Sequence, residues 1–108
     1  SETYRRLAGS FTVVPAESVA DLGRLWPDPA WFVIHDEPAV LAGLEAAFAA
    51  RGSYGPIVAY REELVPERVV AAIDGGAINY LAWPFDAPAL AAAMASVAHL
   101  AEVRCRQA

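Results

Sequence analysis

The fold of this chain is decided by the stretch Gly75-Gly76-Ala77-Ile78-Asn79-Tyr80-Leu81-Ala82-Trp83-Pro84-Phe85-Asp86. Two glycines end a helical pattern, because glycine adopts the left-handed conformation of a helix C-terminus without a Cβ penalty. A short apolar run follows and stops at Trp83-Pro84, where proline cannot donate to a sheet ladder. Asp86 then offers a carboxylate to the free N–H groups of a helix with Pro88 in its first turn. A helix, a buried strand and a second helix in so few residues indicate a parallel α/β sheet.

Length and composition predict one domain spanning residues 1–108. The chain has 108 residues, of which 56% are hydrophobic, and this suits a single core rather than a disordered segment. Its formal net charge of −5 would repel a phosphate backbone, so we expect no direct contact with nucleic acid. No apolar run reaches the roughly 18 residues that span a bilayer. The single cysteine, Cys105, cannot form an internal disulfide, and we expect a cytoplasmic domain without membrane contact.

The rest of the chain alternates apolar runs with amphipathic stretches. We predict a helical fragment at residues 1–9, then strands at 11–14, 31–34, 57–60 and after the two glycines. Helices are predicted at 18–26, from about 40 to 52, from Pro66 onward, and from about Ala87 to Arg104. The helix from Pro66 is expected to pack through Val69, Val70 and Ile73. The last helix is expected to present one apolar stripe, with His99 in solvent; the stripe consists of Leu90, Met94, Val97 and Ala101.

Three residues follow the ends of predicted parallel strands. Asp36 comes after the strand at 31–34, Arg61 after the strand at 57–60, and Trp83 after the last strand. In a parallel sheet the carboxyl ends of the strands lie at one edge, where ligands bind. We therefore expect Asp36, Arg61 and Trp83 to converge there and to form any functional site. His35 is expected to be packed or hydrogen-bonded rather than catalytic.

The motif Gly-Ala-x-x-Tyr-Leu-x-x-Pro-Phe-Asp, with the helical Val69-Val70-Ala71-Ala72-Ile73 before it, resembles the last helix–strand–helix unit of the receiver domain of bacterial response regulators. The resemblance extends over essentially the whole chain. It implies a flavodoxin-like (CheY-like) three-layer α/β sandwich with a parallel sheet. It also places Asp36 at the family's phosphoacceptor position, Tyr80 at its aromatic switch position, and Pro84 at a proline that usually follows a cis peptide bond.

The sequence departs from that family where the family does its chemistry. Receivers hold Mg²⁺ partly through an acidic pair after the first strand, and contact the phosphoryl group with a Lys and a Ser or Thr hydroxyl. Trp83 stands at the Lys position, and Arg61 stands at the hydroxyl position, or Tyr60 does if the register slips by one. Residues 1–9 correspond to the first helix, so the first strand and the acidic pair have no counterpart. We expect the sheet to lack or replace that strand, with the strand at 11–14 pairing directly with the strand at 31–34, or with a partner chain filling the gap.

Phosphoryl transfer depends on positioning and charge neutralisation, so these replacements predict a degenerate receiver, or pseudoreceiver, without enzymatic activity. We hypothesise that Arg61 neutralises Asp36 permanently and locks one switch state. A separation of more than about 4 Å between the two charged groups, with no bridging water, would refute this hypothesis. The expected function is signal transduction through protein–protein interaction, controlling an output such as a DNA-binding domain outside this chain. The partner would be another protein or a second copy, bound at the family's helix 4–strand 5–helix 5 face. Candidate contacts are Arg68, Ala72, Ala82, Trp83 and Ala93.

Two alternatives stay open. One is a working receiver of a two-component phosphorelay, phosphorylated on Asp36 by a histidine kinase with Mg²⁺. The other is a small flavodoxin-like ligand-binding or enzymatic domain that uses His35 and Asp36; a deep polar pocket at the strand edge would favour it. Otherwise we expect no cofactor, because the spacing of His, Cys, Asp and Glu suggests no metal site and no glycine-rich phosphate loop opens a helix.

Overall fold

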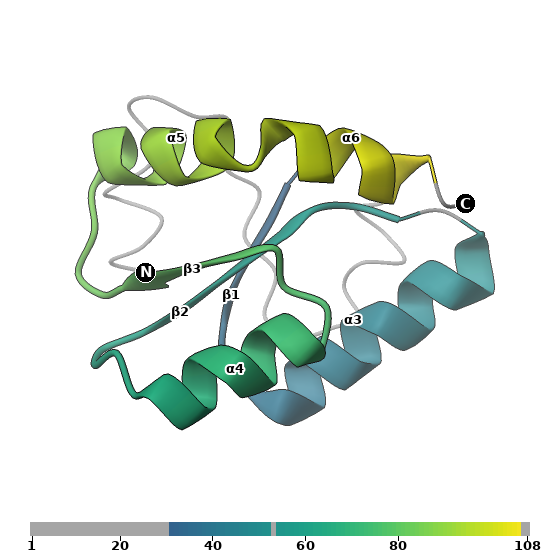
Figure 1. The fold of residues 1–108 in the computed structure, drawn as a ribbon. Helices are drawn as coiled ribbons and strands as arrows, with labels where there is room; N and C mark the ends of the chain where they lie inside the picture. Colours follow the sequence, from purple (N-terminus) through teal and green to yellow (C-terminus); the bar gives the residue numbers. More distant parts are fainter. Residues whose placement is uncertain (1–30, 53, 107–108) are drawn as a thin grey trace.

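The computed structural model describes residues 31–52 and 54–106 (Figure 1). The elements in chain order are β1 (Phe32–His35), α3 (Pro38–Arg51), β2 (Ile57–Arg61), α4 (Pro66–Asp74), β3 (Asn79–Ala82), α5 (Ala87–Ser96) and α6 (Ala98–Cys105). The predicted helical fragment at 1–9, strand at 11–14 and helix at 18–26 lie outside the described residues. Within the described part, no helix has the length and apolar character that crossing a membrane requires.

The described strands form a parallel sheet in the order β1-β2-β3. Helices α3 and α4 lie on one side of this sheet and α5 and α6 on the other, which makes three layers (Figure 1). The prediction of an α/β fold with a parallel sheet is therefore confirmed, and the fold is flavodoxin-like in character. The predicted pairing of the strand at 11–14 with the strand at 31–34 lies outside the described residues.

Strand β2 shows how the sheet separates two apolar layers. Ile57 and Ala59 belong to the cluster under α3 and α4, while Val58 between them belongs to the cluster under α5, as the two-residue period of a strand requires. All three residues are fully buried. A strand covered on both faces needs an uninterrupted apolar run, and this is why residues 57–59 contain no polar side chain.

Local signals set most of the helix boundaries as predicted. Helix α3 ends at Gly52 with φ 64°, and α4 begins at Pro66. Of the two glycines after α4, Gly76 is the one with a positive φ, 120°. The Asp86 carboxylate accepts a hydrogen bond from the Ala89 N–H at 3.0 Å and so caps α5. The Trp83–Pro84 peptide bond is cis, as the resemblance implied.

The prediction of one helix from Ala87 to Arg104 is wrong, because the chain breaks at Val97 with φ −121°. In a continuous helix the Val97 N–H would donate to the Ala93 carbonyl. That carbonyl instead accepts hydrogen bonds from Asn79 Nδ2 and from Ser96 Oγ, each at 2.9 Å. The Val97 N–H donates to the Met94 carbonyl at 3.2 Å. The side chain of Asn79 on β3 thus competes with the helix and divides it into α5 and α6. His99 is exposed, as expected.

The predicted packing face of α4 is also wrong in part. Val70 and Ile73 are 60% and 44% exposed, whereas Ala72 is buried. The helix is rotated so that the small Ala72 faces the core beneath it. This rotation turns Val70 and Ile73 toward solvent, although the periodicity of apolar residues alone would place them inside.

Candidate functional site

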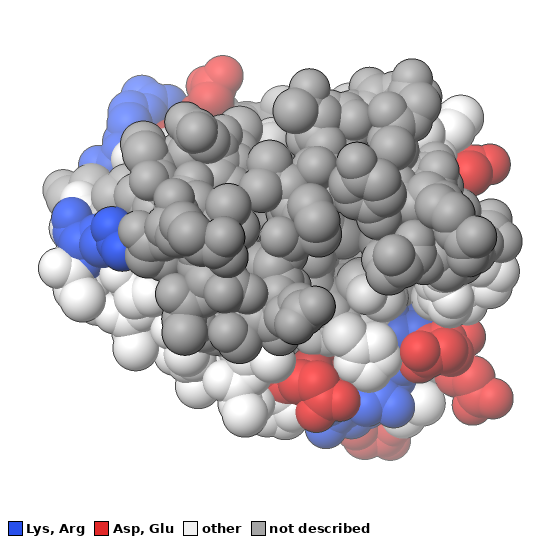
Figure 2. Space-filling model, turned by 180° about the vertical axis from the view of Figure 1, so that it is seen from behind, with Lys and Arg blue, Asp and Glu red and all other residues white. Residues whose placement is uncertain are grey.

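The carboxyl edge of the sheet brings Asp36, Arg61 and Trp83 together, as predicted. Asp36 directly follows β1, Arg61 is the last residue of β2, and Trp83 directly follows β3. The Asp36 N–H donates to the Tyr60 carbonyl at 3.0 Å, and the Trp83 N–H donates to the Arg61 carbonyl at 2.7 Å, so the backbone ladder holds all three strand ends in place. Seen from behind, acidic and basic atoms are intermixed at this end of the molecule, at the lower right (Figure 2).

Asp36 is a buried carboxylate paired with Arg61. Its side chain has no exposed surface. Arg61 Nε donates to Asp36 Oδ1 at 2.8 Å and to Oδ2 at 3.0 Å. This geometry confirms the hypothesised ion pair between Arg61 and Asp36.

Tyr80 of β3 supplies a second donor, since its phenol hydroxyl donates to Asp36 Oδ2. Burial, and after it this hydrogen bond to an anionic acceptor, raises the pKa of Tyr80 to about 12. The phenol therefore stays protonated and keeps donating through the neutral range. The residue that the resemblance placed at an aromatic switch position is bonded directly to the carboxylate.

Arg68 of α4 is a third partner, and sequence reasoning missed it by assigning the residue to the outer surface. Arg68 Nη2 donates to the Asp36 backbone carbonyl at 2.8 Å, and Nε lies 3.5 Å from Oδ2. That Nε atom is buried and has no hydrogen-bond partner. One feature of the sequence could have indicated this contact. Arg68 lies in the first turn of α4, where a positive charge interacts unfavourably with the helix dipole, and this suggests that a nearby carboxylate stabilises it.

The three donors keep Asp36 ionised. Burial by itself raises the pKa of the carboxyl group, but the hydrogen bonds from Tyr80 and Arg61, together with the Arg68 guanidinium beside the carboxylate, outweigh burial and hold the pKa below its usual value. The hydrogen bond to Asp36 in turn raises the pKa of Arg61. The result is one buried carboxylate between two guanidinium groups, which a protein can accommodate only because its charge is matched and its oxygens are bonded.

Trp83 lies at the same carboxyl edge of the sheet and packs against two other aromatic rings. Its ring lies 5.9 Å from that of Tyr60 and 5.2 Å from that of Phe85, measured between centroids. Phe85 belongs to the buried cluster under α5, and Tyr60 and Trp83 pack against that cluster. The indole is half-buried and covers the end of this cluster as an apolar cap.

His35 is hydrogen-bonded and packed, as expected. Its Nε2 lies 3.2 Å from Glu62 Oε2, and its ring meets Tyr60 edge-on at 5.5 Å between centroids. The pKa of Glu62 is lowered mainly by a hydrogen bond from the backbone of Glu62 itself and, to a smaller extent, by the hydrogen bond with His35. Among residues 31–52 and 54–106, no group of three or more His, Cys, Asp and Glu side chains could hold a metal ion.

A small pocket of about 130 Å³ adjoins Asp36 between α3 and α4. It is lined by Asp36, Arg68 and a set of small or apolar residues: Pro38, Leu41, Ala42, Ala71, Ala72 and Gly75. Small-molecule sites usually enclose roughly 300–1,000 Å³. This pocket is therefore too small for most metabolites, and it is not the deep polar pocket that would favour a ligand-binding or enzymatic domain.

The predicted interface contacts divide between surface and core. Ala72 and Ala93 are only 2% and 8% exposed, so their assignment to the surface is wrong. Arg68 is turned inward to Asp36. Ala82 is exposed and Trp83 is half-buried, which leaves these two accessible. Small residues on a helix serve close packing as readily as contacts between molecules, and here they serve packing.

No protein-family model matches this chain, and no curated protein is significantly similar to it. What is established is an α/β domain whose three described parallel strands alternate with helices. Any function must therefore be argued from the site itself.

Proposed function

We propose that this domain is a receiver-like regulatory module, a pseudoreceiver, that acts by protein–protein interaction without phosphorylation of Asp36. The observation that supports this most directly is the pair in which Arg61 Nε contacts both oxygens of a carboxylate with no exposed surface. In this proposal the pair replaces a reversible phosphate by a permanent internal cation, and the domain stays in one state.

The chemistry of phosphoryl transfer supports the same conclusion. A carboxylate attacks phosphorus through an oxygen lone pair, while cations neutralise the transferring group. Here Oδ1 accepts from Arg61, and Oδ2 accepts from Arg61 and Tyr80. An incoming phosphate would have to displace these donors and reach a side chain that solvent does not touch. Trp83, at the position of the family's Lys, offers no cation to guide it.

The proposed contact surface consists of the outward side of α4, the end of β3 and α5. These elements share one side of the molecule, the one facing the reader in Figure 1. Val70 and Ile73 of α4 are large apolar residues that are 60% and 44% exposed, and Ala82 at the end of β3 is also exposed. Val70 and Ile73 are three residues apart on one helix and therefore neighbours on its surface, and adjoining exposed apolar side chains are typical of contact surfaces. A protein partner or a second copy bound there would control an output outside this chain.

The phosphorylation test uses the chain with acetyl phosphate and Mg²⁺, read by intact mass. We expect no adduct under conditions in which an active receiver, run in parallel, is phosphorylated. An adduct of one phosphoryl group that disappears in Asp36→Asn would overturn the proposal.

The surface test uses sedimentation velocity over a concentration series. If the partner is a second copy, the wild type associates, and Val70→Glu with Ile73→Glu abolishes association. Leu100→Glu with Val103→Glu on α6 is the matched control, because these residues are also exposed and apolar. Association that survives the α4 variant, or fails equally in the α6 variant, would refute this surface.

A working phosphoacceptor receiver is the second candidate. The observation that favours it is the position of an ionised carboxylate at the end of β1, because an anion is what attack on phosphorus requires. The acetyl phosphate experiment separates the two candidates. The size of the pocket beside Asp36, about 130 Å³, weighs against a ligand-binding enzyme that uses His35 and Asp36.

A further inference from the structure

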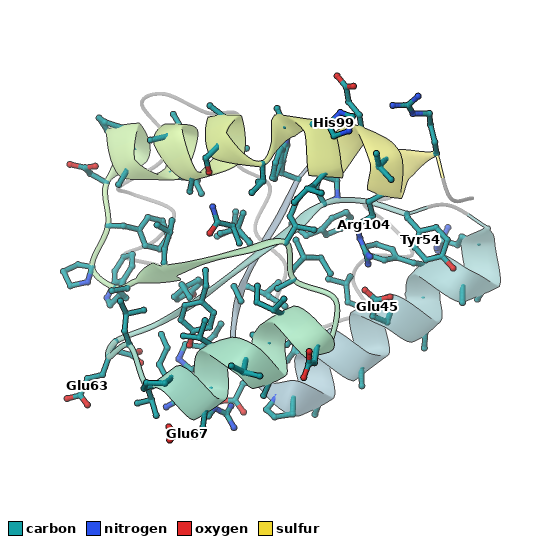
Figure 3. All side chains as sticks on the ribbon, in the orientation of Figure 1. Glu45, Tyr54, Glu63, Glu67, His99 and Arg104 are labelled. Atoms are coloured by element: carbon teal, nitrogen blue, oxygen red, sulfur yellow. The ribbon has the colours of Figure 1, made fainter. Side chains whose placement is uncertain are left out.

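A second ion pair, which is partly buried, lies away from the Asp36 site, where α6 meets α3 and the segment that precedes β2. Arg104 of α6 forms an ion pair with Glu45 of α3, and its Nε donates to the Gly55 carbonyl at 2.8 Å. Its guanidinium carbon lies 5.4 Å from the ring centroid of Phe48 and 5.5 Å from that of Tyr54. Figure 3 shows Arg104 reaching from α6 toward Glu45 and Tyr54.

The residues that surround the Arg104 guanidinium all come from parts of the chain outside α6. Phe48 is fully buried in the cluster under α3, and its ring meets that of Tyr54 at 5.9 Å. A Cβ atom at Gly76 would collide with the Glu45 carboxylate, so the turn after α4 closes against this side chain. The carboxylate, the Gly55 carbonyl and two aromatic faces thus form a socket for one cation.

Apart from Arg104, helix α6 has few buried side chains that would hold it against the rest of the domain. It is separated from α5 by the break at Val97, and of its residues only Ala101 is buried. Leu100 and Val103 are exposed. Within the described residues, Arg104 makes all the side-chain hydrogen bonds and ion pairs that join α6 to another element, since Arg106 bonds only to Glu102 of the same helix.

We propose that α6 is a hinged latch, which pivots at Val97 and is held closed by Arg104 in the socket of Glu45, Gly55, Phe48 and Tyr54. In the described part of the chain, the Arg104 side chain, which is 13% exposed, makes all the polar side-chain contacts between α6 and other elements. Opening would uncover the Phe48 and Tyr54 rings while the sheet and α5 stay folded. Elements held by few buried apolar contacts are those that open locally. The latch is independent of whether the domain is a pseudoreceiver.

The test is amide hydrogen exchange by NMR on the full chain, comparing wild type with Glu45→Gln and Arg104→Met. We expect the α6 amides to exchange roughly ten- to a hundredfold faster in either variant, because a charge-assisted attachment is lost. Amides of β2 and α5 should change by less than about twofold. Arg106→Met is the matched control, since it removes an arginine of the same region whose side chain, among the residues that the structure describes, bonds only to Glu102 of its own helix.

The salt dependence of α6 amide exchange is a second test that needs no substitution. At about 1 M NaCl the screening length falls to about 3 Å, but a partly buried pair is screened less than a surface pair. Exchange of the α6 amides in the wild type should therefore rise part of the way toward that of Glu45→Gln, and the variant should respond less than the wild type. The latch is refuted if α6 exchange is unchanged in both variants. It is equally refuted if α6, α5 and β2 accelerate together, because Arg104 would then support global stability only. Should Arg104→Met fail to fold, Glu45→Gln and the salt series still decide.

Discussion

Arg61 and Asp36 are joined by one nitrogen that bonds to two oxygens, with Nε 2.8 Å from Oδ1 and 3.0 Å from Oδ2. Asp36 directly follows His35, and Arg61 directly follows Tyr60. His35 and Tyr60 lie opposite each other in the parallel ladder of β1 and β2. The register of the sheet therefore places the two side chains side by side. Because the carboxylate is buried and matched by cations, it contributes to stability as well as to the proposed locked state.

Asp36→Asn should lower the free energy of unfolding by about 2 kcal/mol. The variant keeps the shape of the side chain but leaves two guanidinium groups without their anion. Removal of a partner from a fully buried pair costs more, about 3–5 kcal/mol, but Arg61 and Arg68 are 31% and 32% exposed, so solvent screens part of the loss. Urea unfolding at pH 7 measures the effect. Glu63→Gln, an exposed acid on the loop at the same edge, is the control and should change little.

The contribution of Asp36 should depend on pH in a defined direction. Its pKa is lowered in the folded state, so its stabilisation is fully present above the unfolded carboxyl pKa of about 3.9 and is lost as the pH falls through the folded value. The stability difference between wild type and Asp36→Asn should be constant from pH 7 to about pH 5 and shrink below about pH 4. Urea unfolding at a series of pH values tests this. A difference that grows as the pH falls would contradict the assignment.

Tyr80 should titrate far above an ordinary tyrosine, with a pKa of about 12. Phenolate absorbance in the ultraviolet should be recorded as a function of pH for the wild type and for Tyr80→Phe. The difference between the two titration curves should show one phenol that ionises near pH 12. Because the pKa is raised on folding, the stabilisation by this hydroxyl is present below about pH 10 and lost as the pH rises through the folded value. At pH 7 the phenylalanine variant should lose about 1 kcal/mol. A phenol that titrates near pH 10 in the difference curve would show that the contact with Asp36 is absent.

Gly76→Ala should destabilise the fold more than Gly52→Ala, although both glycines have a positive φ. At Gly52 an added Cβ meets nothing within 4 Å, so alanine suffers only the left-handed backbone strain of about 1 kcal/mol. At Gly76 the Cβ also collides with the Glu45 carboxylate, which Arg104 holds in place. We expect a loss above about 2 kcal/mol for Gly76→Ala in urea unfolding. Equal losses in the two variants would mean that Glu45 moves aside freely.

The elements of the described part follow from local chemistry. Apolar runs at residues 31–34 and 57–60, the proline that opens α4, the glycine that closes α3 and the capping Asp86 all act within a few residues of where they stand. The convergence of Asp36, Arg61 and Trp83 then follows from a general rule, because parallel strands present their carboxyl ends at one edge. The sequence alone was therefore enough for the parallel α/β fold and for the convergence of these residues, whereas the Asp36–Arg61 pair was a hypothesis that the structure confirms.

Only the tertiary structure decided which other side chains complete the site. The donors Arg68 and Tyr80 lie 32 and 44 residues from Asp36, and Glu45 lies 59 residues from Arg104. Such contacts depend on how each helix is rotated about its axis, and that rotation is set by packing against the sheet and neighbouring helices together. The same long-range packing buried Ala72 and Ala93, and brought Asn79 to the carbonyl that divides the last helix. Periodicity records which residues share a face, whereas the fold determines what that face meets.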